Sequence, residues 1–295
     1  MSPACTSISV GSGTTPSASN AGHFRGGSGE PLVLIHGFSG TRHNWDAVLP
    51  LLTQRFDVVA PTLAGHHQGE HLPEGVEATV EALADALERQ MDAAGLETAH
   101  LAGNSLGGWL ALALARRGRA RSVVCLSPAG GWERGSRAER KIRRLFTRNR
   151  KLSLRFEGLI DKAVRRPRLR RLILRDVMRR GDRLTPAEAS ALIHGSLGCT
   201  IYFELMGAIL RDGVPTWFGE LDAPVLVSWS EHDRILPHGS CSAGFGSIPN
   251  VELVTLREVG HTPMWDDPEL VVSTIAEFAG RHAGVASRAT ATGAP

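Results

Sequence analysis

Short apolar runs that end at Gly, Pro or Ser recur along this 295-residue chain, and they constrain its fold more than any other feature. Such runs lie at 31–37, 56–61, 99–103, 121–127, 224–230 and 251–256. Each is almost continuously hydrophobic, which is typical of a strand buried on both faces of a parallel sheet. The segment Gly22 to Arg25 has the pattern of a short edge strand ahead of the first run.

Helical periodicity fills several of the gaps between these runs. Apolar residues recur at helical spacing within 44–54, 76–94, 106–117 and 268–282. An alternation of strand and helix predicts an α/β fold with a mostly parallel, doubly wound sheet. We expect residues 22–130 and 214–284 to form this core.

The alternation stops at 131–213, where the patterns are helical and the charge changes sign. Residues 130–185 hold 20 Lys and Arg against 6 Asp and Glu, a balance of +14, whereas the other 239 residues hold 13 against 24, a balance of −11. The sequence therefore predicts a basic helical insertion in a mildly acidic core. Residues 1–21 and 285–295 have few large apolar side chains, so we expect a disordered N-terminal segment and a flexible tail.

Several function classes are disfavoured by composition. No apolar run approaches the roughly 18 residues that span a bilayer, and the N-terminus lacks the basic start and apolar stretch of a secretory signal. Four scattered cysteines are expected to be free thiols in the cytoplasm, and we expect no metal or cofactor because no Cys or His group has ligand spacing. Aromatic residues are few in the basic insertion, which argues against nucleic-acid binding.

The segment 103–107, with the sequence GNSLG, lies where a predicted strand meets a predicted helix. This is the context of a nucleophile elbow, in which Ser105 occupies a strained turn and the flanking glycines avoid collisions with neighbouring elements. The helix start directs its amides and the positive end of its dipole at the same point. We predict that Ser105 is a nucleophile; the alternative interpretation is a serine that caps the helix.

A serine hydroxyl needs a base within hydrogen-bond reach, and that base needs a third group to orient it. Asp233 follows the run at 224–230, and His261 follows the run at 251–256. Both therefore fall at the carboxyl ends of parallel strands, where open α/β sheets place their sites. We predict that His261 is the general base and that Asp233 orients it. The neighbouring groups that we interpret as loop, capping or solvated side chains are Asp222, Glu231, His232 and His238.

An oxyanion hole is expected from two backbone amides. One is that of Leu106, after the nucleophile, and the other is that of Phe38, in the loop 36–40 that follows the first apolar run. We expect His36 to fix this loop by hydrogen bonds without touching substrate. Trp109 and Trp132 are candidate substrate-binding residues in an apolar pocket, although a packing role in the core fits each equally well.

Five pieces of the sequence, in this order, resemble the α/β-hydrolase superfamily over about residues 22–282 outside the insertion. The pieces are GEPLVLIHGFSGTRHNW, PTLAGHH, LAGNSLGGWLALALA, LVSWSEHDRILP and EVGHTPMWDDPE. The resemblance implies a serine carboxylesterase whose insertion is a helical lid that shapes the pocket. It disfavours the haloalkane dehalogenases and epoxide hydrolases of this fold, which carry an aspartate where this chain has Ser105.

The GNSLGG form of the elbow is also similar to that of the meta-cleavage-product hydrolases, which break a carbon–carbon bond. Those enzymes commonly carry a lid arginine and a tryptophan directly after the catalytic histidine. Here Thr262 follows His261, and Trp265 is three residues further on, which weakens that likeness.

We therefore predict hydrolysis of a small-molecule carboxylic ester through an acyl-serine intermediate. Two alternatives stay open: carbon–carbon bond hydrolysis with the same three residues, and a non-catalytic small-molecule binder on the same fold. The basic insertion is either a solvated face or an electrostatic funnel for an anionic or carrier-bound substrate. The sequence indicates neither the acyl group nor the oligomeric state.

Overall fold

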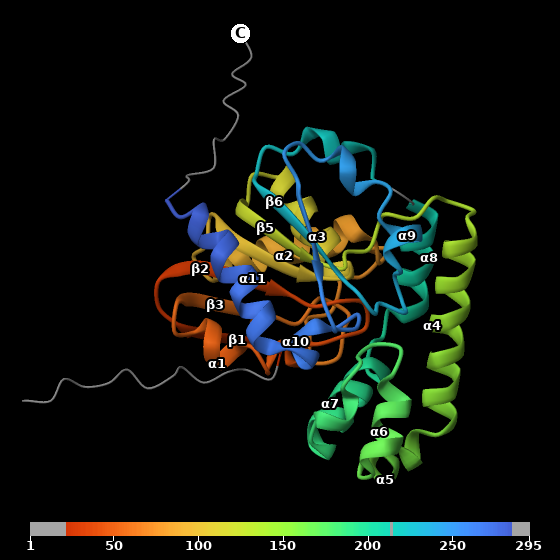
Figure 1. The fold of residues 1–295 in the computed structure, drawn as a ribbon. Coiled ribbons are helices and arrows are strands. Elements are labelled where there is room, and N and C mark those ends of the chain that lie inside the picture. The colour runs from red at the N-terminus through yellow and green to blue at the C-terminus, as the bar shows by residue number, and fades with distance from the viewer. Residues whose placement is uncertain (1–21, 213–214, 285–295) are drawn as a thin grey trace, which may run out of the picture.

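A computed structural model describes residues 22–212 and 215–284 of the chain (Figure 1). Its centre is a seven-stranded sheet in the order β1-β3-β2-β4-β5-β6-β7, in which β1 runs antiparallel to β3 and the other pairs are parallel. The strands are β1 (His23–Gly27), β2 (Glu30–Ile35), β3 (Phe56–Pro61), β4 (Ala99–Asn104), β5 (Ala120–Leu126), β6 (Val225–Ser230) and β7 (Glu252–Leu256). The predicted α/β sheet and its edge strand are confirmed, whereas the expectations for 1–21 and 285–295 lie outside the described residues.

The near-continuous hydrophobicity of the strands is explained by helices on both faces of the sheet. Alternate residues of β2 enter different cores, with Leu32 and Leu34 on one side and Val33 and Ile35 on the other. The first core also contains α1 (Leu49–Leu52) and α11 (Pro268–Arg281), and the second contains α2 (Val80–Ala93) and α3 (Leu106–Arg116). Figure 1 shows α11 crossing in front of the strands. The strands β2 to β6 therefore bury both faces, as the pattern indicated. The edge strands do not: β1 is only partly buried, and Leu253 and Val254 of β7 are exposed, so the expectation that the run at 251–256 is buried on both faces is wrong.

Two of the expected helices have different limits in the structure. The segment 44–54 is not one helix: a 3-10 turn, η1 (Arg42–Trp45), is followed by the separate short α1, because Pro50 has no backbone N–H and fits only the first turn of a helix. In α2 the helix starts at Val80 and not at Val76, since the Thr79 side chain accepts a hydrogen bond from the amide of Ala82 and caps it there.

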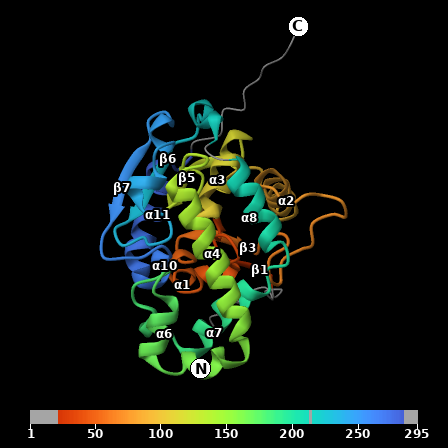
Figure 2. The same cartoon turned by 90° about the vertical axis from the view of Figure 1, so that its right-hand side faces the viewer.

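The predicted helical insertion lies between β5 and β6. Its helices are α4 (Arg137–Arg155), α5 (Ile160–Val164), α6 (Pro167–Leu174), α7 (Pro186–Leu197) and α8 (Tyr202–Asp212), with 3-10 turns at η2 (Glu157–Leu159) and η3 (Gly181–Arg183). Figures 1 and 2 show α6 and α7 at an end of the molecule that projects beyond the sheet. A small core of its own, which includes Val164, Leu174 and Ile193, holds this end together. We refer to residues 131–212 as the insertion.

The remaining short elements lie after the insertion. They are η4 (Thr216–Glu220), α9 (His238–Cys241), η5 (Phe245–Ser247) and α10 (Pro263–Asp266). No single described helix has the length and apolar character needed to cross a membrane; α7 and α8 together reach it by length and composition, but they are bent by 74° at their junction. Cys125, Cys199 and Cys241 are buried free thiols, as expected, and Cys5 lies outside the described residues.

Candidate functional site

Ser105 occupies the sharp turn between β4 and α3. Its backbone has φ 57° and ψ −119°, a left-handed conformation that is strained for a residue with a side chain. The turn is tight enough that a Cβ added at Gly107 would overlap the carbonyl oxygen of Ile35, and one at Gly103 would overlap the carbonyl of Gly107. The two glycines thus have the steric role predicted for them, and they hold Ser105 at the end of β4.

His261 and Asp233 meet at the same edge of the sheet. The Nδ1 atom of His261 lies 2.7 Å from Oδ2 of Asp233, and both residues are buried. The other carboxylate oxygen of Asp233 accepts hydrogen bonds from the amides of Ile235, at 2.9 Å, and Leu236, at 2.7 Å. Because the carboxylate is held from both sides, it fixes the proton of His261 on Nδ1 and leaves Nε2 as an acceptor.

A cavity of about 740 Å³ joins these groups. Ser105 and His261 line it together with Gly37 and Phe38, so the structure brings the predicted nucleophile and base to one space. Most of the remaining wall comes from the insertion and is apolar. Insertion residues in that wall include Phe146, Phe156, Leu159, Ile173, Met178 and Tyr202.

Asn104 links the turn at Ser105 to the loop that carries His261. Its buried side-chain amide donates to the carbonyl of Leu126, at 2.9 Å, and to the carbonyl of His261, at 2.8 Å. The backbone of His261 is therefore held against the elbow independently of the contact with Asp233. Sequence reasoning gave Asn104 no role, since nothing in the elbow pattern indicates the partner of that side chain.

The loop 36–40 is fixed by His36 as predicted. Its Nε2 accepts a hydrogen bond from the amide of Leu63, at 2.9 Å, so Nδ1 is the protonated nitrogen and donates to the carbonyl of Gly37, at 2.8 Å. Complete burial, with His66 beside it, holds the pKa of His36 well below its ordinary value of 6.5. His36 is therefore a neutral structural residue under this loop.

One of the two amides predicted for an oxyanion hole belongs to the residue after Ser105, and the other to the adjacent loop 36–40. Leu106 is the first residue of α3, where a helix has no acceptor for the amide, and Phe38 follows Gly37 in the loop beside Ser105. Neither amide donates a hydrogen bond to any group in the part of the chain that the structure describes. Both are thus available to an atom bound next to Ser105.

The structure does not bring Trp109 and Trp132 to the cavity. Only 3% of Trp109 and 2% of Trp132 are exposed, and the two rings meet edge to face in the core with centroids 6.5 Å apart. The physical reason is that α3 is apolar on all sides and is buried all round, so Trp109 faces packing partners and not the pocket. Their position does not support the expectation that they bind substrate.

Comparisons with known proteins identify the family of this fold. A family model described as the alpha/beta hydrolase fold matches residues 30–268. The chain belongs to this family. It is 37% identical over 202 residues to the epoxide hydrolase EphH of Mycobacterium tuberculosis, covering 66% of this chain and 92% of that protein. It is 28% identical over 264 residues to a pimeloyl-[acyl-carrier protein] methyl ester esterase of Nitrosomonas europaea, covering 84% and 94%. A thermophilic esterase from Thermogutta terrifontis superposes with a TM-score of 0.69 at 25% identity, covering 88% of this chain and 93% of that one.

One buried acid of this α/β-hydrolase, Asp266, was missed by sequence reasoning. Only 1% of it is exposed, and its carboxylate accepts hydrogen bonds from the amides of Arg179, Arg180 and Gly260. Gly260 directly precedes His261, whereas the two arginines belong to the insertion. Asp266 therefore ties the insertion to the histidine loop. The sequence alone does not distinguish Asp266 from its neighbour Asp267, whose side chain caps the start of α11.

A second contact between the insertion and the core involves Thr262, the residue after His261. The amide of Thr262 donates to the carbonyl of Val177 at 2.8 Å, and its hydroxyl donates to the same oxygen at 2.9 Å. Across the cavity, the hydroxyls of Ser39 and Ser196 lie 2.8 Å apart and join the loop 36–40 to α7. The insertion that lines the cavity of the α/β-hydrolase is thus hydrogen-bonded to the core on both sides.

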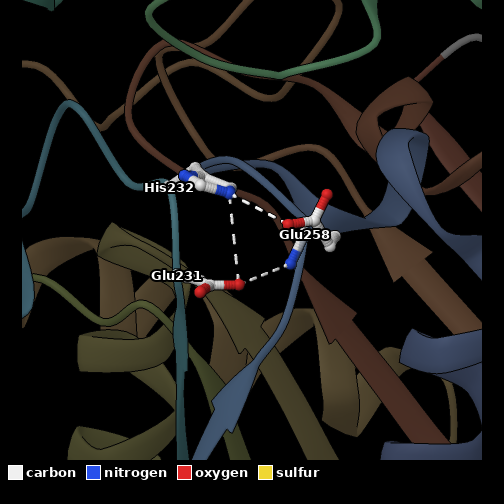
Figure 3. A group of neighbouring side chains, drawn as sticks. All are labelled: Glu231, His232 and Glu258. Atoms are coloured by element: carbon white, nitrogen blue, oxygen red, sulfur yellow. Dashed lines mark hydrogen bonds and ion pairs between the residues drawn. The ribbon is translucent and has the colours of Figure 1, made fainter.

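Figure 3 shows the surface group formed by Glu231, His232 and Glu258. Glu231 accepts from the amide of Glu258 at 2.9 Å, and Nε2 of His232 lies 3.4 Å from a carboxylate oxygen of Glu258. The hydrogen bond from His232 lowers the pKa of Glu258. Among the described residues these three form the only group with metal-ligand spacing, but all are exposed and already paired with one another. Of this stretch it is the buried Asp233 whose carboxylate contacts His261.

Proposed function

We propose that this α/β-hydrolase cleaves carboxylic esters through an acyl intermediate on Ser105. The main support is one arrangement: a strained Ser105 shares a cavity with His261, whose Nδ1 is bound by the buried carboxylate of Asp233. A serine, an oriented imidazole and two free amides are the groups that acyl transfer to a hydroxyl requires.

In the acylation step, Oγ of Ser105 attacks the ester carbonyl while Nε2 of His261 takes the hydroxyl proton. The carbonyl oxygen becomes an oxyanion, which accepts hydrogen bonds from the amides of Phe38 and Leu106. Asp233 stabilises the imidazolium that forms. When the tetrahedral intermediate collapses, the bond to the alcohol oxygen breaks, and His261 returns the proton to that oxygen as the alcohol leaves.

In the second step, water replaces the alcohol. His261 removes a proton from the water as it attacks the acyl-serine, and the same two amides bind the new oxyanion. Collapse breaks the bond to Ser105, which recovers its proton from His261, and releases the carboxylic acid. One imidazole therefore takes up a proton twice and gives it up twice in each cycle.

The nature of the nucleophile favours ester hydrolysis over epoxide opening. A carboxylate that opens an epoxide forms an ester, which water can then hydrolyse at its carbonyl. A serine hydroxyl that did so would form an ether, which has no carbonyl for water to attack and would end turnover. With Ser105 at the elbow, acyl chemistry is the reaction that this site can complete, even though a relative from M. tuberculosis is named an epoxide hydrolase.

We further propose that the insertion, predicted as residues 131–213, acts as a lid on the core formed by 22–130 and 214–284. Its apolar side chains supply most of the cavity wall, which suits the hydrocarbon part of an ester. Arg150, which also lines the cavity, donates to the carbonyls of Ser196 and Cys199 and stacks over Tyr202. These contacts use Nη1 and Nη2 and support the wall, whereas Nε of Arg150 is buried without a partner among the described residues. Arg148 and Arg175 line the same cavity, so the carbon–carbon hydrolase alternative stays open.

The test is hydrolysis of p-nitrophenyl esters from acetate to decanoate by the full chain and by Ser105→Ala. We expect serine-dependent turnover that rises with acyl length until the cavity is filled, and labelling by a fluorophosphonate that the variant abolishes. Styrene oxide serves as the competing substrate and should remain intact. Turnover retained in Ser105→Ala, or epoxide opening in place of ester cleavage, would contradict the proposal.

A further inference from the structure

Exposed apolar side chains are concentrated in one stretch of the insertion. Of the eleven large hydrophobic side chains that are exposed among the described residues, seven lie within 152–173. Their exposed fractions run from 37% to 56%. They are Leu152, Leu154, Phe156, Leu159, Leu169, Leu172 and Ile173. Clusters of this kind on a protein surface mark a site of interaction, because leaving them in water is costly.

The same stretch, which we call the insertion tip (residues 152–173), is strongly basic. It holds seven Lys and Arg against two Asp and Glu. Lys162, Arg166 and Arg168 are exposed, and none forms an ion pair with any acid that the structure describes. These cations are therefore not neutralised within the described chain.

Two arginines of the core, by contrast, form ion pairs with acids of the same chain. Arg117 binds three carboxylates of α2, and Arg119 binds two carboxylates of the same helix. Arg55 and Arg89 of the core are exposed and form no ion pair with the described acids either, but neither lies in a stretch with exposed large apolar side chains. The tip is distinguished by having unpaired cations and exposed apolar side chains in the same stretch.

The tip is also where the cavity meets the surface. Leu159, Leu172 and Ile173 line the cavity that contains Ser105, yet about half of each side chain is exposed. Figures 1 and 2 show that α6, which carries two of them, lies at the projecting end of the molecule. A ligand that reaches Ser105 through this opening passes between apolar side chains surrounded by cations.

We propose that the insertion tip docks on an anionic lipid surface and admits amphiphilic esters from it. Apolar side chains among Lys and Arg have the composition that binds the headgroup region of anionic membranes. A second copy of the chain would bring the same unpaired cations against these and is disfavoured by repulsion. An acidic protein would match the charge of the tip but would also need a complementary apolar surface for its exposed leucines. The interior of a lipid layer is fluid and can bury these side chains without such a fit. The docking goes beyond the proposed esterase activity and does not require it.

The test is co-sedimentation of the full-length Ser105→Ala protein, which cannot digest lipid by the proposed mechanism, with extruded vesicles. Vesicles of phosphatidylcholine and phosphatidylglycerol in equal parts are compared with pure phosphatidylcholine. We expect binding to the anionic vesicles alone, weakened by added salt. Because a cation near such a surface contributes about fivefold, K162Q/R166Q/R168Q should lower the partition coefficient about 100-fold.

The matched control removes three exposed cations from the core, as R55Q/R89Q/R257Q, and changes the net charge equally. It should bind almost as the parent does. A second variant, L154S/L169S, removes tip leucines that do not line the cavity and should weaken binding about tenfold, in a salt-independent way. Equal losses in both triple variants, no binding to either vesicle, or a dimer in light scattering that L154S/L169S dissociates would each overturn the proposal.

Discussion

Replacing Asp266 by Asn should destabilise this α/β-hydrolase far more than the same change at its neighbour. The Asp266 carboxylate receives three backbone amides: Arg180 at 2.6 Å, Gly260 at 2.7 Å, and Arg179, which lies 2.9 and 3.0 Å from the two oxygens. Asn has one acceptor oxygen, and its NH₂ group would face an N–H donor. At least one amide would lose its partner, and those that remain would lose the assistance of a charge.

The size of the effect follows from the burial of the site. A hydrogen bond to a charged group contributes about 1.5–3 kcal/mol, and a buried N–H left without a partner costs about 1–3 kcal/mol. Asp266→Asn should therefore lower the free energy of unfolding by about 3–5 kcal/mol, a large share of the roughly 5–15 kcal/mol that a domain has. Turnover should fall as well, since Gly260 precedes His261.

The assay is urea unfolding followed by circular dichroism, with ester hydrolysis measured in parallel. Asp267→Asn is the matched control: among the described residues the Asp267 side chain accepts only the amide of Leu270, as the cap of α11, and Asn caps a helix as well as Asp does. We expect the control to unfold near the wild-type midpoint. If both variants share one midpoint, the role assigned to the Asp266 hydrogen bonds is wrong.

Three further predictions concern the elbow, the acid and the pH range. Gly107→Ala should abolish activity and destabilise the fold, because the added Cβ would overlap backbone atoms of Ile35 and His36. Gly207→Ala in α8 is the control: its Cβ would have no neighbour within 4 Å, so this variant should be neutral or slightly stabilising. Equal thermal midpoints for the two variants would count against the steric account. Asp233→Asn should lower kcat about 10⁴-fold while preserving the fold, as judged by circular dichroism, and a kcat near wild type would remove Asp233 from the mechanism. Burial lowers the pKa of His66 to about 4, so between pH 6.5 and 4 the unfolded chain binds a proton at His66 that the folded protein does not bind, and this residue alone should lower the free energy of unfolding by about 3 kcal/mol. Buried His36, whose pKa is also lowered, adds to that fall. His66→Gln should reduce the pH dependence by the share of His66, and an unchanged slope would refute the assignment.

The features that could be predicted from sequence are those with a local physical cause. The strands β2 to β6 were visible because burial on both faces requires continuous hydrophobicity. The edge strands β1 and β7 also lie where they were expected, although β7 is mostly exposed. Ser105 was visible because a strained turn between strand and helix requires glycines on either side of it. Asp233 and His261 followed from their positions after β6 and β7, where a parallel sheet collects its loops.

The features that were missed depend on contacts between distant segments. Nothing near Asp266 in the sequence indicates that its partners are amides 86 and 87 residues away. Trp109 and Trp132 are large aromatics close to the elbow, yet the direction that each faces is set by the packing of α3 and not by distance along the chain. The break between η1 and α1 could have been anticipated from Pro50, which ends the possibility of one continuous helix there.

The place of the insertion between β5 and β6 has a consequence for how this chain could have diversified. The two strands are neighbours in the sheet, and α8 packs on the core as the connecting helix of a plain strand–helix–strand crossover would. Helices α4 to α7 are then an outgrowth of one connection, and they can lengthen, shrink or be exchanged without changing the strand order. Selection could thus change these helices while leaving the segments that carry Ser105, Asp233 and His261 in place, and a chimera carrying another family member's insertion is the corresponding engineering route to new selectivity.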